Sequence, residues 1–299
     1  MMLLMLLACG GDVDTGTPSQ DRGALTDTTP GPGGPSGPGP GAPGPGAGDD
    51  TAPPTAGSDT GDADEVDTGA SWTGEPGDYA LTHDGRDLWL HVPEGYDASA
   101  PIPLVIGFHG AGDSGADFNA VVSAYGWTAA ATSAGFALLI PDTKSPYSDF
   151  AIWSGNPNDD VDEMIAELDE VLAIADWLGD TWRLDPAQRH LFGFSDGGLF
   201  TAVAGMSRAS TVASLTVVGY GWGSFYPLVT PPRLLPVQFA CGSSDSFHSY
   251  AQDSESYLSG QGHDTRMLSV SGAGHSFSGV MGGASPDDLA AWMLARPLP

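Results

Sequence analysis

Positive charge is scarce in this chain of 299 residues. Lysine and arginine together number 9, against 38 aspartates and glutamates, so the formal net charge at pH 7 is −29. A surface this acidic is repelled by phosphate backbones, and we therefore expect no nucleic-acid partner. The same charge disfavours strongly anionic substrates such as pectate.

Cysteine and long apolar runs are also scarce. The two cysteines, Cys9 and Cys241, exclude a disulfide scaffold and a zinc site built from several thiolates. We expect Cys241, at the end of an apolar run, to be a structural thiol. No internal stretch of about 20 apolar residues occurs, which excludes an ordinary transmembrane helix.

Aromatic residues are missing from the first part of the chain, where Trp72 is the first one. Glycine and proline, 43 and 25 in all, are concentrated in residues 10–71 together with Asp and Thr. Such a segment buries too little apolar surface to offset its ordering entropy. We therefore predict a disordered linker over residues 10–71 and one large domain over residues 72–299.

Residues 1–9 are an apolar run that is too short to span a bilayer. The run resembles the end of a bacterial lipoprotein signal, with Leu6-Leu7-Ala8-Cys9 as the cleavage site. This resemblance implies that Cys9 is lipidated and that the protein faces outward from the cell envelope on a membrane anchor. The alternative is an ordinary secretory signal and a secreted protein.

Strand and helix patterns alternate from Trp72 onward. A hairpin is predicted around His83-Asp84-Gly85. Further strands are predicted at residues 103–109, 136–140, 189–194, 215–219, 236–240 and 267–270, and helices at 118–133, 161–175, 199–206, 250–258 and 286–294. This order predicts a mostly parallel sheet of about eight strands, with helices on both faces and the hairpin as an antiparallel edge. Ligands bind such sheets at the carboxyl ends of the strands.

The sharpest motif is Gly193-Phe194-Ser195-Asp196-Gly197-Gly198, which lies between a predicted strand and a predicted helix. A Gly-x-Ser-x-Gly sequence in this context is typical of a nucleophile elbow, where glycines avoid clashes around a strained serine. We therefore predict that Ser195 is a nucleophile.

A serine nucleophile needs a base, and the base needs an acid that orients it. The chain order Ser, acid, His found in hydrolases of this architecture favours His275, on a glycine-rich loop after the last predicted strand. The first carboxylate after the preceding strand is Asp245, with Asp253 and Asp264 left open as alternatives.

The oxyanion of the reaction needs two backbone donors. We expect one from the N–H of Asp196 and the other from Ala111, in the loop His109-Gly110-Ala111-Gly112. The Asp196 carboxylate must then turn away from the oxyanion, and His109 is expected to brace the loop rather than act as a base.

With these motifs the chain resembles α/β-hydrolases of the polyhydroxybutyrate depolymerase and feruloyl esterase type. Matching pieces include residues 90–96, Phe108-His109-Gly110, residues 184–186, the elbow, residues 241–245 and Gly274-His275. The resemblance implies the triad Ser195, Asp245 and His275 and hydrolysis of carboxylic esters through an acyl-enzyme, without metal or organic cofactor. Three aromatic residues that follow strands are candidates for the substrate pocket or, equally, for core caps: Trp153, Trp222 and Phe247.

Two other functions remain open at this stage. One is a serine peptidase on the same scaffold, and the other is a non-catalytic surface-binding protein. For an esterase, the substrate could be feruloyl-polysaccharide, acetylated xylan, a polyhydroxyalkanoate or a small ester.

Overall fold

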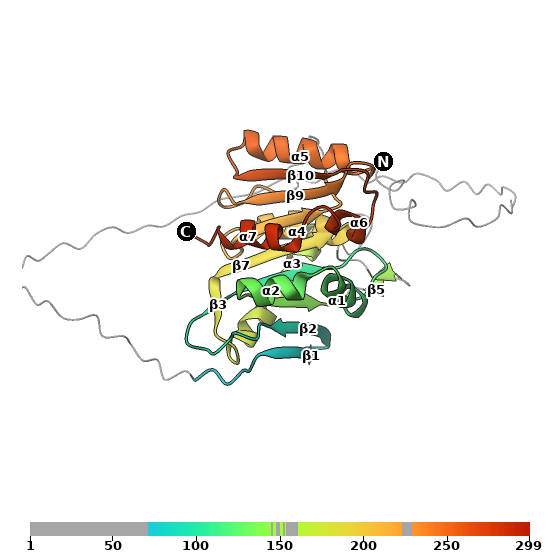
Figure 1. Ribbon diagram of the computed structural model, residues 1–299. Coiled ribbons are helices and arrows are strands. Elements are labelled where there is room, and N and C mark those ends of the chain that lie inside the picture. The colour runs from blue at the N-terminus through green and yellow to red at the C-terminus, as the bar shows by residue number, and fades with distance from the viewer. Residues whose placement is uncertain (1–70, 145, 148–149, 152, 154–160, 223–228) are drawn as a thin grey trace, which may run out of the picture. The chain divides into compact units, whose positions relative to one another are not determined.

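An eight-stranded sheet forms the centre of the described structure (Figure 1). The computed structural model describes residues 71–144, 146–147, 150–151, 153, 161–222 and 229–299. The predicted signal and residues 10–70 of the predicted linker lie outside these residues. The strands are β1 (Gly77–His83), β2 (Arg86–Val92), β3 (Ile102–Phe108), β4 (Ala137–Pro141), β7 (Leu184–Phe194), β8 (Ser214–Val218), β9 (Val237–Gly242) and β10 (Thr265–Val270).

The strand order is β1-β2-β4-β3-β7-β8-β9-β10. The pairs β1–β2 and β2–β4 are antiparallel, and every other neighbouring pair in this sheet is parallel. The predicted edge hairpin is confirmed, and its turn has positive φ at both Asp84 and Gly85, as a two-residue turn requires. The fold is the α/β-hydrolase fold that the sequence predicts.

Helices cover both faces of the sheet. One face carries α1 (Gly115–Ala124), α2 (Trp127–Ala134), α6 (Phe277–Met281) and α7 (Pro286–Leu294); the other carries α3 (Val161–Gly179), α4 (Asp196–Ser207) and α5 (His248–Gly260). Figure 1 shows α2 and α7 side by side, in agreement with their contacts. Within the described segments, no helix is both long and apolar enough to cross a bilayer.

Several local predictions differ from the structure. The single helix expected over residues 118–133 is two helices, α1 and α2, because the chain turns at Gly126 with φ 97°. The short helix α6 and the small hairpin of β5 (Pro146–Tyr147) and β6 (Phe150–Ala151) were not predicted. The terminal helix is as predicted, with Ser285 accepting a hydrogen bond from the N–H of Asp288.

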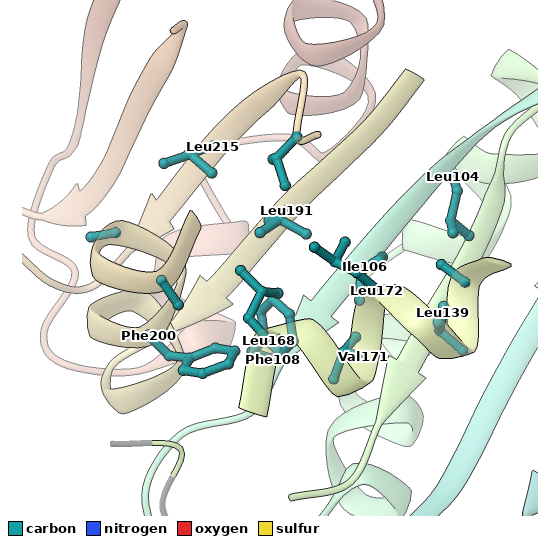
Figure 2. Packing of buried hydrophobic residues seen from close by; sticks show 14 of the residues in the cluster. Leu104, Ile106, Phe108, Leu139, Leu168, Val171, Leu172, Leu191, Phe200 and Leu215 are labelled. Carbon is teal, nitrogen blue, oxygen red and sulfur yellow. The ribbon is translucent and has the colours of Figure 1, made fainter. Parts of the chain in front are cut away.

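The core beneath α3 and α4 holds the central strands together. Figure 2 shows leucine, isoleucine and valine side chains of the sheet and of α3 interdigitating, with Phe108 and Phe200 beside them. Because β3 and the last part of β7 (residues 191–193) are buried on both faces, both segments are continuous apolar runs in the sequence. Their parallel register pairs Phe108 with Gly193, which brings the loop after β3 next to the residue that follows β7.

Candidate active site

Ser195 occupies a strained turn between β7 and α4. Its φ is 55° and its ψ is −111°, a conformation that residues with a side chain rarely adopt. Its backbone N–H donates to the carbonyl oxygen of Val218 at 2.9 Å, which ties the turn to the neighbouring strand β8. The serine therefore stands at the carboxyl edge of the sheet, at the N-terminus of a 12-residue helix.

Glycines around the serine are required by close backbone approach. A Cβ atom at Gly197 would overlap the carbonyl oxygens of Phe108 and His109, so the first turn of α4 lies directly against the end of β3. A Cβ atom at Gly193 would overlap the carbonyl group of Gly197. The elbow motif is thus explained by packing on both sides of Ser195.

The three predicted triad residues meet at this edge. The Nδ1 atom of His275 lies 2.8 Å from Oδ2 of Asp245, and its Nε2 atom lies 2.9 Å from Oγ of Ser195. Since a carboxylate only accepts hydrogen bonds, Nδ1 carries a proton and Nε2 is left to accept the serine proton. This is the arrangement in which a histidine acts as a general base on a serine.

Asp245 is buried but remains ionised. Burial opposes its charge, yet hydrogen bonds from His275 and from the N–H of Phe247, at 2.9 Å, outweigh burial and hold the pKa of Asp245 below its ordinary value. The neighbouring Cys241 is fully buried, and burial together with the charge of Asp245 raises the pKa of its thiol to about 12. Cys241 is therefore a protonated, inert thiol, as expected.

The predicted oxyanion donors both belong to segments that lie against the serine. Gly110 packs against Ser195, since a Cβ atom at Gly110 would lie 3.6 Å from that of the serine. The next amide, that of Ala111, has no acceptor among the described residues. The amide of Asp196 is the first of α4, where the helix dipole favours negative charge.

The carboxylate of Asp196 turns away from this position, as the mechanism requires. Its Oδ2 atom accepts a hydrogen bond from the backbone N–H of Trp153 at 2.7 Å. Asp196 is buried, with 8% of its surface exposed. The side chain is therefore tied to the backbone of Trp153 and does not face the predicted oxyanion position.

The three aromatic candidates have different surroundings. Trp153 is 1% exposed and packs on Phe108 and Phe200, so it caps the core and does not line an open pocket. The ring of Phe247 lies 5.3 Å from that of His275, beside the triad. Trp222 lines a cavity of about 190 Å³ between α4 and α5, and its role toward a substrate stays a prediction.

Other residues at the site were not singled out from the sequence. Phe194 stacks on His275 with ring centroids 5.2 Å apart, and Tyr220 contacts Phe247. The alternative acids are excluded by their positions, because Asp253 is exposed on α5 and Asp264 pairs with Arg296. Among the residues that the structure describes, no group of three or more His, Cys, Asp or Glu is arranged to hold a metal ion.

The fold is the α/β-hydrolase fold, and Ser195, His275 and Asp245 have the geometry of a serine with a base and an orienting acid. No protein-family model matches the chain. The chain is 30% identical over 140 residues to a protein named probable feruloyl esterase C from Aspergillus terreus, which corresponds to 46% of this chain and 47% of the relative. The chain thus matches about half the length of this curated relative, and over that half the expected resemblance to feruloyl esterases is confirmed.

Solved structures show the same fold. Dienelactone hydrolase from Anabaena variabilis superimposes with a TM-score of 0.55 at 21% identity, covering 75% of this chain and all of the other. A ferulic acid esterase from Anaeromyces mucronatus, solved with ferulic acid, gives a TM-score of 0.55 at 15% identity over 71% of this chain and 89% of the other. At such identities these likenesses establish the fold.

Proposed function

We propose that this protein is a serine carboxylic-ester hydrolase that acts through an acyl-enzyme. The observation that carries the proposal is the continuous hydrogen-bonded chain from Asp245 through His275 to Ser195, at 2.8 and 2.9 Å. The likeness to a probable feruloyl esterase supports the same reaction.

The reaction follows from the geometry. His275 accepts the hydroxyl proton through Nε2 while Ser195 Oγ bonds to the ester carbonyl carbon. The backbone N–H groups of Ala111 and Asp196 stabilise the oxyanion that forms. Collapse of the intermediate breaks the bond to the alcohol oxygen, which takes the proton from His275. Water then repeats these steps on the acyl-enzyme and releases the acid.

We propose an ester with an aromatic acyl group, such as a feruloyl ester of a polysaccharide, as the substrate class. Phe247 is a half-buried aromatic side chain beside His275, Tyr220 packs on Phe247, and flat apolar rings suit an aromatic acid. Acetylated xylan, polyhydroxyalkanoate and small aliphatic esters are the comparisons that test this choice.

The function is tested with a fluorophosphonate probe and ester assays on the purified protein. The wild type should react covalently at Ser195 and hydrolyse short p-nitrophenyl esters, and Ser195→Ala should do neither. Ser207→Ala, at the opposite end of α4, is the matched control and should retain both. Retained turnover in Ser195→Ala would refute the assignment. Failure of the wild type to react would favour a non-catalytic surface protein, and cleavage of peptides alone would favour a peptidase.

We also propose that the enzyme is held at the outside of a bacterial cell by a lipid on Cys9. The support is the sequence Leu6-Leu7-Ala8-Cys9 followed by a Gly- and Pro-rich segment long enough to act as a tether. Expression in a bacterial host with labelled palmitate should give a labelled, membrane-bound protein. Cys9→Ser should be unlabelled, and an unlabelled wild type would exclude the anchor.

A further inference from the structure

His109, at the end of β3, is a second histidine beside the nucleophile. It has no exposed surface. Its Nδ1 atom lies 2.9 Å from the carbonyl oxygen of Gly110, and its Nε2 atom lies 3.3 Å from Oδ1 of Asp142, which follows β4. The second contact is electrostatic, because it lacks the alignment of a hydrogen bond.

Both ring nitrogens of His109 therefore face acceptors. A backbone carbonyl accepts only, so Nδ1 carries a proton. Asp142 is ionised: burial opposes its charge, but contacts with His109 and with the N–H groups of Gly115 and Thr143 hold its pKa below the ordinary value. A lone pair on Nε2 would lie 3.3 Å from this negative oxygen and be repelled, so the contact favours a second proton and a positively charged ring.

The bond to Gly110 reaches the oxyanion donor directly. The carbonyl of Gly110 and the N–H of Ala111 belong to one peptide group, and in a trans peptide they point in opposite directions. The carbonyl is held by Nδ1 of His109 and by the N–H of Asp113 at 3.2 Å. Holding it there aims the N–H of Ala111 to the other side of the peptide plane.

Charged groups on the packed elements complete the surroundings of His109. Arg86, fully buried at the start of β2, donates to the backbone oxygen of Asp142 at 2.6 Å and pairs with Glu167 and Glu170 of α3. Lys144 pairs with Glu170 in turn. On the remaining side, the ring of Trp153 lies 5.0 Å from that of His109, and the backbone N–H of Trp153 donates to the Asp196 carboxylate. Asp142 is thus fixed from both its backbone and its side chain.

We propose that His109 and Asp142 are positioning residues: an imidazolium–carboxylate pair that holds the Gly110–Ala111 peptide in the orientation needed to stabilise the oxyanion. The inference rests on the proposed ester hydrolysis. The pair makes full activity depend on the protonation of two histidine rings, one of which must be neutral and the other charged. His275 must be neutral to act as a base, and His109 must be charged to stay tethered to Asp142.

Kinetics across pH test the pair. A histidine base gives a kcat that rises with pH, and a second histidine that must be charged should add a fall of kcat at alkaline pH. His109→Asn keeps a donor at the position of Nδ1 but cannot be charged, so it should lose the alkaline fall and about 10-fold or more in kcat, with KM little changed. Asp142→Asn, of equal size, should move the alkaline fall to lower pH and leave the acid side, set by His275, in place.

The matched control is His190→Asn, another fully buried histidine, on the adjacent strand β7 but without a carboxylate partner. It should lower stability and leave the shape of the pH profile unchanged. If His109→Asn and Asp142→Asn both retain the wild-type profile and kcat, or if His190→Asn changes the profile in the same way, the proposal is overturned.

A readout that does not need activity separates this inference from the proposed function. In ¹⁵N-histidine-labelled wild type, with its signal assigned by its loss in His109→Asn, the ring of His109 should carry two protons at neutral pH. The same ring should lose a proton at lower pH in Asp142→Asn. A neutral ring at pH 7 overturns the charged pair even if esters are hydrolysed. A charged ring without any ester hydrolysis leaves the pair intact and refutes the function.

Discussion

Strand β7 has a buried histidine near its middle and a strained serine just past its end, and the two positions treat charge differently. His190 contacts only neutral partners, Ser214 Oγ at 2.8 Å and Gln188 Oε1 at 2.9 Å, and burial lowers its pKa to about 4. At the carboxyl end, His275 and His109 each contact a carboxylate. Burial among neutral partners thus keeps the His190 ring neutral, whereas each histidine at the carboxyl edge has a negative charge beside it.

The difference comes from what each edge can supply. At the carboxyl edge, loops carry Asp142 and Asp245, and α4 begins with its N–H groups directed at the reacting atoms. Backbone strain and close glycine contacts gather there as well, while Gly179, which precedes β7, has open space around it. Substitutions at the carboxyl edge should therefore lower activity or stability strongly, and substitutions at the amino edge should change them little.

The largest difference is expected between two aspartates. Asp245→Asn should lower kcat about 10⁴-fold, because an amide cannot hold His275 in the required tautomer. Asp185→Asn, at the amino end of β7, removes a carboxylate whose one hydrogen-bond donor among the described residues is the N–H of Ala187. It should leave kcat within about 2-fold of wild type, as measured with p-nitrophenyl esters. If both variants lost kcat to a comparable degree, the carboxyl edge would have no special role in catalysis.

Two glycines sharpen the contrast in stability. Gly197→Ala should cost about 3 kcal/mol or more, since its Cβ would overlap the carbonyl oxygens of two residues that cannot move independently of β3. Gly179→Ala, at the last residue of α3, should be neutral or stabilise by about 0.5–1 kcal/mol. Urea unfolding of both variants checks this. A stable Gly197→Ala would mean that α4 does not pack against β3 as described.

Much of this site follows from local sequence. The elbow, the strand before it and the helix after it are adjacent in the chain, and the order of acid and base follows from the order of parallel strands. Ser195, Asp245 and His275 were therefore predictable, although 80 positions separate Ser195 from His275. The break at Gly126 was not, because a single glycine within a helical pattern is compatible with both a continuous helix and a turn.

Contacts between distant elements were beyond the sequence pattern. Asp142 reaches His109 only because β4 and β3 are neighbours in parallel register, and nothing local to either residue indicates it. Trp153 follows β4 and was a reasonable pocket candidate. Its burial depends on Phe108, Phe200 and the carboxylate of Asp196, which come from β3 and α4.

His190, away from the triad, supplies a test that depends on pH. Its folded-state pKa of about 4 lies below the ordinary value of 6.5, so the unfolded chain binds more protons between these values. Its contribution to stability is complete above about pH 6.5 and is lost as the pH falls toward 4, by about 3 kcal/mol. His190→Gln removes this loss, and its unfolding free energy should fall less steeply than that of wild type between pH 6.5 and 4. Parallel curves would contradict a neutral, buried His190.

The smallest expected difference is one of stability, between two substitutions of the nucleophile that both abolish activity. Ser195→Gly and Ser195→Ala both remove the hydroxyl, but only glycine adopts φ 55° and ψ −111° without strain. Ser195→Gly should therefore be more stable than Ser195→Ala by about 1 kcal/mol in urea unfolding, although both lack activity. The same pair of substitutions at Ser207, which is helical, should give the opposite order because glycine weakens a helix. If glycine is not the more stable residue at position 195, the carboxyl edge does not store strain at its serine.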